Sequence, residues 1–167
     1  MRPGDLIFVR GNTWVSKAIR QITGGHYSHV DIFIGKGQAI GAELGVGVRK
    51  VEYLSAYGSD ALTVCMVACS DATAQAVVND VCKMVGTQYD ARGLFGVWAR
   101  FALKRLGIHL TSTPADQTGA YFCSEMAAAL YRKQGIEICP DLHPSLTSPT
   151  DLYEANVVIE IKEERRP

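Results

Sequence analysis

The chain has 167 residues, close to the length of one average domain, and 47 % of them are hydrophobic while 20 % are charged. Seventeen Lys and Arg residues balance seventeen Asp and Glu residues, so we expect no strongly basic surface that would attract nucleic acid over long range. The composition predicts one globular domain over residues 1–167, with no nucleic-acid partner.

The N-terminal segment predicts a strand and no targeting signal. MRPGDLIFVRG has only a short apolar run before Arg10, whereas a signal peptide carries an apolar core of roughly 7–15 residues. No apolar run approaches the roughly 18–20 residues of a membrane-spanning helix. We therefore expect no transmembrane segment and a protein that is cytoplasmic as synthesised, which a separate machinery would deliver to any site in the cell envelope.

Strand patterns dominate the first seventy residues. Apolar, β-branched and aromatic residues predict strands at 5–10, 26–35, 38–44, 46–53 and 61–69. The Gly35-Lys36-Gly37 sequence predicts a turn that joins the second and third strands as a hairpin. One helix is predicted over 13–25, with Trp14, Ala18, Ile19 and Ile22 on one face and Gly24-Gly25 as its end.

Helical periodicity dominates the rest of the chain. Segment 71–86 has Asp71 as a candidate N-cap and an apolar face that includes Cys82. Further helices are predicted over 93–107 and 122–134, followed by a proline-rich loop over 139–149 and a last strand over 157–161. This order predicts an α+β fold with helices packed against one face of a mainly antiparallel sheet.

The five cysteines do not form a disulfide framework, because their number is odd and their spacing is irregular. Cys65 and Cys69 lie along one predicted strand, about 13 Å apart, which is too far to share a zinc ion. We expect Cys65, Cys69 and Cys82 to be buried structural cysteines. No motif predicts a metal or an organic cofactor.

Cys123 differs because it opens a helical pattern, in YFCSEM over 121–126. The free backbone N–H groups and the dipole at a helix start favour an anion, so a thiol there is more readily deprotonated and more nucleophilic. Those N–H groups can also donate to a developing oxyanion. The alternative is a small hydrophobic residue packed into the core like Ala127, and the local pattern leaves both interpretations open.

A nucleophilic cysteine needs a general base, and His29 is the best placed of the four histidines. It lies inside a predicted strand, on the same face as Asp31 and Phe33, and a rigid strand can hold an imidazole in one orientation. The alternative is an ordinary histidine of the sheet. We expect structural or surface roles for the other three, His26, His109 and His143.

A third, polar group is expected to orient the imidazole. Asp31 qualifies because it is two residues from His29 on the same strand face. Glu43 also qualifies, because the hairpin at residues 35–37 would bring it across from His29.

Three motifs, in order, resemble one known family. PGDLIFVRG (3–11), SHVDIFIG (28–35) and YFCSEM (121–126) resemble the circularly permuted branch of the NlpC/P60 papain-like superfamily, which includes YiiX/YaeF-like hydrolases and, more distantly, lecithin:retinol acyltransferase-like proteins. The resemblance extends from Pro3 to about Gln134. Two positions depart from the family pattern: Asp31 stands where a small residue is usual, and Gly41 where the third polar residue is usual, with Glu43 as the nearest match.

The resemblance implies a thiol peptidase or amidase with Cys123 as nucleophile, His29 as general base and acid, and Glu43 as the third residue. The expected substrate is a peptide or another amide or ester, first of all a bacterial peptidoglycan peptide, as for a cell-wall enzyme of a bacterium or a phage. One alternative is a lipid acyltransferase or thioesterase, with segment 93–107 as the lipid-facing element. Another is a non-catalytic binding module or phage structural part on the same fold.

Overall fold

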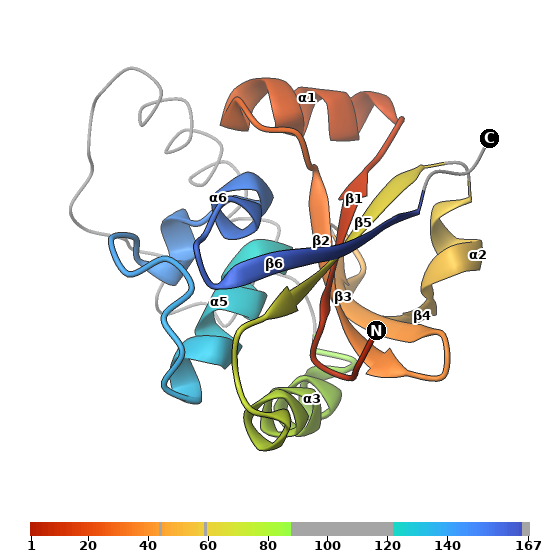
Figure 1. Ribbon diagram of the computed structural model, residues 1–167. Helices are drawn as coiled ribbons and strands as arrows, with labels where there is room; N and C mark the ends of the chain where they lie inside the picture. Colours follow the sequence, from red (N-terminus) through yellow and green to blue (C-terminus); the bar gives the residue numbers. More distant parts are fainter. Residues whose placement is uncertain (44, 59, 88–121, 165–167) are drawn as a thin grey trace.

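The computed structural model describes residues 1–43, 45–58, 60–87 and 122–164. Within these ranges the chain forms a six-stranded sheet in the order β4-β3-β2-β1-β5-β6, in which every neighbouring pair is antiparallel (Figure 1). The strands are β1 (Leu6–Arg10), β2 (His29–Gly35), β3 (Gln38–Glu43), β4 (Gly47–Glu52), β5 (Ala61–Val67) and β6 (Val158–Glu164). The α+β class predicted from the sequence is confirmed.

The helices of the described ranges lie on both sides of this sheet, and α5 and α2 are on opposite sides in Figure 1. They are α1 (Trp14–Thr23), α2 (Tyr53–Tyr57), α3 (Asp71–Met84), α5 (Cys123–Lys133) and α6 (Pro149–Tyr153), with a 3-10 turn, η2 (Pro144–Leu146). The helices predicted over 71–86 and 122–134 form α3 and α5, which pack on the same face of the sheet, whereas the short α2, which the sequence did not predict, packs on the other. In the parts of the chain described, no helix combines the length and apolar character needed to cross a membrane.

The strand alternation divides the buried side chains into two cores, because successive residues of a strand point to opposite faces. The larger core joins the Val30 and Ile32 side of the sheet to the inner faces of α3 and α5. The smaller core joins the Phe33 side to Tyr53 of α2. The face predicted for His29 and Asp31 is therefore that of the smaller core.

The hairpin between β2 and β3 was predicted correctly. Gly35, Lys36 and Gly37 all have positive φ, at 100°, 52° and 73°, and two of the three are glycines, which adopt this conformation without strain. After the turn, Ala39 pairs with Phe33 and Ile40 with Ile32. The register carries β3 back along β2 toward the residues of the predicted site.

Several local predictions need correction. Ser70, not Asp71, caps α3, since its Oγ accepts from the Thr73 N–H at 3.1 Å. Cys82 is exposed, because it lies about 100° around the helix from Val81, past the edge of the buried face. The 139–149 loop includes η2 and the start of α6, which are too short to give a periodic pattern. The helix predicted over 93–107 lies outside the described residues.

Candidate functional site

Cys123 is the first residue of α5, as predicted, and follows Phe122 in extended conformation. The first backbone bond of the helix runs from the Met126 N–H to the Phe122 carbonyl at 2.8 Å. The Cys123 N–H precedes it, so it has no acceptor within the helix. Buried Ser124 donates from Oγ to the Thr147 carbonyl at 2.6 Å and ties the helix start to the segment before α6.

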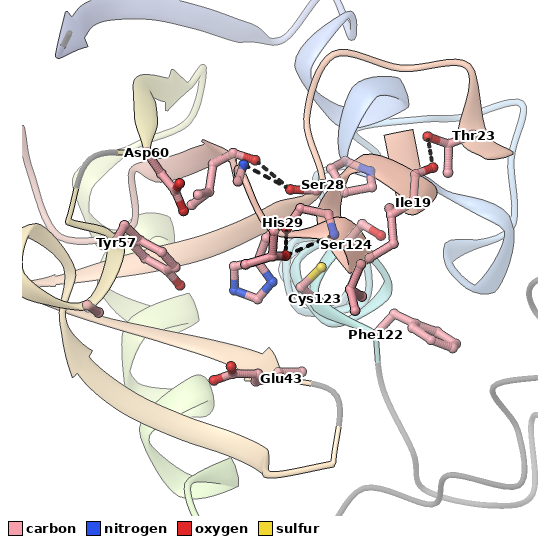
Figure 2. A pocket seen from close by; sticks show the side chains of 18 of the residues that line it. Ile19, Thr23, Ser28, His29, Glu43, Tyr57, Asp60, Phe122, Cys123 and Ser124 are labelled. Atoms are coloured by element: carbon pink, nitrogen blue, oxygen red, sulfur yellow. Dashed lines mark hydrogen bonds between the residues drawn. The ribbon is translucent and has the colours of Figure 1, made fainter. Parts of the chain in front are cut away.

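The sulfur of Cys123 lies next to the His29 ring (Figure 2). Burial raises the pKa of the Cys123 thiol. Three effects lower it: the charge of His29, a hydrogen bond with the His29 ring, and a hydrogen bond from the Val30 backbone N–H. The net result is a pKa below the ordinary value for a thiol. Burial lowers the pKa of His29, but the charges of Asp31 and Cys123 and hydrogen bonds to both hold it well above its usual value. These opposite shifts favour a thiolate beside an imidazolium.

Asp31 is the carboxylate that contacts the histidine. Its Oδ1 lies 2.6 Å from His29 Nε2, and its Oδ2 accepts a hydrogen bond from the Tyr57 hydroxyl. The Asp31 side chain is 1 % exposed and the His29 side chain 19 % exposed. Burial, followed by the Asp31 charge, raises the pKa of Tyr57, so the phenol stays a hydrogen-bond donor at any physiological pH.

Glu43 lies at the end of β3 and lines the same cavity as His29 (Figure 2). Its carboxylate is bonded to the Arg49 guanidinium, and both side chains are partly exposed, at 43 % and 35 %. The structure thus brings Glu43 into the neighbourhood of the predicted site, while the carboxylate on His29 Nε2 is that of Asp31.

A cavity of about 610 Å³ opens over Cys123 and His29. One wall is the face of α1 that carries Trp14, Val15, Ile19 and Ile22. No residue of α1 is buried, and Trp14 is 79 % exposed. The apolar face predicted for this helix is therefore directed to the cavity and not to either core.

The remaining histidines that the structure describes lie apart from this cluster. His26 is exposed, and His143 Nδ1 accepts from the Ser145 N–H at the start of η2. His109 lies outside the described residues. In the described part of the chain, no group of three or more His, Cys, Asp or Glu side chains is placed to hold a metal ion.

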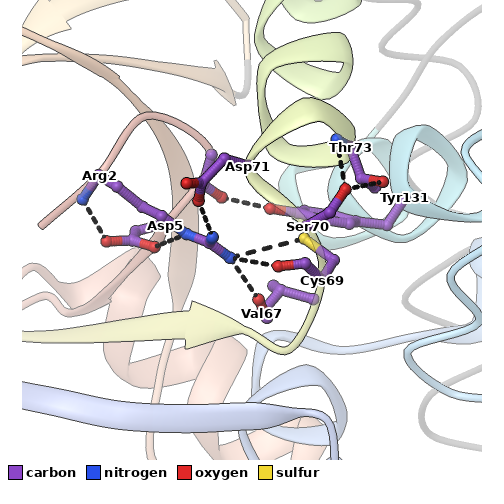
Figure 3. A network of polar contacts seen from close by, with 9 residues as sticks. Arg2, Asp5, Val67, Cys69, Ser70, Asp71, Thr73 and Tyr131 are labelled. Atoms are coloured by element: carbon purple, nitrogen blue, oxygen red, sulfur yellow. Dashed lines mark hydrogen bonds and ion pairs between the residues drawn. The ribbon is translucent and has the colours of Figure 1, made fainter.

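The far end of α5 is held by contacts with the N-terminus (Figure 3). The Tyr131 hydroxyl donates to the Gly4 carbonyl. Arg2 forms an ion pair with Asp71 at the start of α3 and donates to the Cys69 carbonyl at 3.0 Å. These bonds fix the segment before β1 against α3 and α5, so both ends of the helix that carries Cys123 are anchored.

Sequence reasoning missed Tyr57, the second partner of Asp31. It lies on the five-residue α2, which is too short to show helical periodicity. The contact between Ser124 and Thr147 was also missed, since nothing in the local sequence indicates which carbonyl a buried serine will reach.

No family model matches the chain, and neither does any curated protein sequence. Among solved structures, the fold is similar to the crystal structure described as metalloprotein yiiX from Escherichia coli O157:H7, DUF1105. The TM-score is 0.67 at 16 % sequence identity, over 99 % of this chain and 98 % of that one. The YiiX-like fold expected from the sequence motifs is therefore confirmed at the level of the fold.

Proposed function

We propose that this chain is a cysteine-dependent hydrolase with one circularly permuted papain-like domain of the NlpC/P60 type over residues 1–167. The observation that carries the proposal is the meeting of Cys123 and His29. A cysteine at the first position of a helix and a histidine on a distant strand come together in a cavity, and the pKa of each is shifted toward its charged form. Such paired perturbation is typical of nucleophilic sites.

The proposed reaction is cleavage of an amide bond through an acyl-enzyme. The Cys123 thiolate attacks the carbonyl carbon, and the oxygen that gains the negative charge accepts from the Cys123 N–H at the helix start. The His29 imidazolium protonates the leaving nitrogen as the C–N bond breaks. His29 then takes a proton from water as the water attacks the thioester, and free acid and thiolate are regenerated.

The first substrate class is a peptide of bacterial peptidoglycan, which would place the activity in the cell envelope. The direct test is incubation with purified peptidoglycan peptides and mass spectrometry of the products. We expect cleavage by the wild-type protein and none by Cys123→Ala with an unchanged circular dichroism spectrum. Equal cleavage by both proteins would contradict the mechanism.

A second candidate, cleavage or transfer of a lipid acyl chain, is favoured by the walls of the cavity. The apolar face of α1 borders the space above Cys123, as an acyl chain would require. Hydrolysis of a long-chain acyl thioester, lost in Cys123→Ala and weakened in Ile19→Asp, would support this candidate over the peptidase.

A folded protein whose Cys123 reacts no faster than an ordinary thiol would instead indicate a non-catalytic binding module.

A further inference from the structure

We propose that Asp31, held in place by Tyr57, is the residue that positions His29, and that Gly41 lacks a side chain because the Asp31 carboxylate fills that space. This inference rests on the proposed Cys123–His29 site. The two positioning residues are then Asp31 of β2 and Tyr57 of α2, in place of Glu43 of β3.

The Asp31 carboxylate is fixed at both of its oxygens. Oδ1 lies 2.6 Å from His29 Nε2, and Oδ2 accepts from the Tyr57 hydroxyl. The carboxylate therefore cannot rotate without breaking one of these bonds. Because Nε2 is engaged, Nδ1 is the ring nitrogen left to face Cys123, and a buried negative charge on the far side of the ring favours the imidazolium form.

Gly41 on β3 gives independent support, because its backbone does not require glycine. Its φ is not among the positive values of the chain, so an alanine could adopt its conformation. The constraint is space: a Cβ built at Gly41 would lie 1.7 Å from Asp31 Oδ1 and 3.0 Å from His29 Nε2. A side chain at position 41 and the carboxylate of Asp31 in its present place exclude each other.

In the part of the chain that the structure describes, charged and titratable groups surround His29 from several elements. They are Asp31 of β2, Glu43 of β3, Arg49 of β4, Tyr57 of α2, Cys123 of α5, and Asp60 before β5, whose carboxylate lines the cavity and accepts from the Asn12 N–H. Glu43 and Arg49 neutralise each other in a partly exposed pair, where solvent weakens their effect on the ring. Asp31 is the buried, directly bonded carboxylate, so it has the larger influence on His29.

The first test compares two near-isosteric variants, Asp31→Asn and Glu43→Gln. The His29 pKa is measured by NMR of the imidazole, and the rate of Cys123 alkylation by iodoacetamide at pH 6 is measured by mass spectrometry. For Asp31→Asn we expect the pKa to fall by about one unit or more and alkylation to slow about tenfold. Tyr57→Phe should change both in the same direction but less than Asp31→Asn does, and Glu43→Gln should change both least.

The second test moves the carboxylate to the neighbouring strand. Asp31→Ala removes it, and the double variant Asp31→Ala/Gly41→Asp restores a carboxylate beside Nε2 from β3. We expect the double variant to recover alkylation severalfold over Asp31→Ala alone. No recovery, together with a His29 pKa unchanged in Asp31→Asn, would mean that Asp31 only fills space and would overturn the inference.

The two proposals fail in distinguishable ways. If no amide or ester is hydrolysed but Asp31→Asn shifts the His29 pKa as expected, the hydrolase proposal fails and the positioning role stands. If hydrolysis occurs but Glu43→Gln shifts the His29 pKa and Asp31→Asn does not, the positioning role fails and Glu43 takes it. Should Asp31→Asn not fold, the comparison of Tyr57→Phe with Glu43→Gln decides between the same two outcomes.

Discussion

The change Gly41→Ala adds one methyl group at the point where β3 passes the Asp31 carboxylate. The new Cβ would lie 1.7 Å from Oδ1, whereas such atoms essentially never approach closer than 3.0 Å. Oδ1 must therefore retreat by about 1.3 Å, and because the new Cβ would also lie 3.0 Å from His29 Nε2, a retreat directly away from the methyl group lengthens the 2.6 Å contact with His29 to about 3.0 Å, which weakens this hydrogen bond. Overpacking and the weakening of this bond together predict a destabilisation of about 1–3 kcal/mol.

The assay is urea unfolding followed by fluorescence, combined with the rate of Cys123 alkylation at pH 6. The matched background is Asp31→Ala, in which the clash with the carboxylate is absent. There Gly41→Ala should cost at least about 1 kcal/mol less than in the wild-type protein, which a double-mutant cycle measures directly. Equal costs in both backgrounds, or wild-type stability and reactivity for Gly41→Ala alone, would refute the spatial argument.

Three other predictions concern the anchoring and ionisation of α5. Ser124→Ala removes the bond to the buried Thr147 carbonyl and should lower the free energy of unfolding in urea by about 1–3 kcal/mol. The control Ser55→Ala removes an exposed bond and should lower it by less than about 0.5 kcal/mol, so similar losses in the two variants would contradict the anchoring role of Ser124. Tyr131→Phe removes the hydroxyl that donates to the Gly4 carbonyl and should lower the free energy of unfolding by about 1–3 kcal/mol. Tyr153→Phe removes a hydroxyl bonded to an exposed carboxylate and should lower it much less, and the reverse order would contradict the anchoring of α5 by the N-terminal contacts in Figure 3. Because the pKa of Cys123 is lowered, its thiolate should persist below the pH at which an ordinary thiol is protonated. The rate of alkylation by iodoacetamide should therefore stay constant as the pH is lowered from 9 and fall only when the Cys123 thiolate is protonated. A rate that already falls tenfold per pH unit below pH 9 would indicate an ordinary thiol.

Local sequence patterns predicted most of the sheet, because alternation and turn residues are signals of short range. The hairpin at Gly35-Lys36-Gly37 has the residues that positive φ demands, and the placement of His29 and Asp31 on one strand face follows from the pleat. The position of Cys123 at the start of α5 also follows from a local change of periodicity.

The identity of the carboxylate on His29 could not be decided in this way. Strand register places both Asp31 and Glu43 near the ring, and the difference lies in side-chain volume and in the competing partner Arg49. The informative signal in the sequence was Gly41, a glycine inside a strand with no turn to make. Its meaning became clear only because a Cβ at this position would lie 1.7 Å from Asp31 Oδ1.

The central claim is that His29 activates Cys123, and the rate at which iodoacetamide alkylates Cys123 at pH 7 tests it without knowledge of the substrate. The experiment uses a Cys82→Ser background, which removes the exposed cysteine, and compares His29→Ala with His26→Ala, a change at an exposed histidine. We predict that His29→Ala slows alkylation at least about tenfold, while His26→Ala leaves it unchanged. Equally slow alkylation in all three proteins would contradict the account.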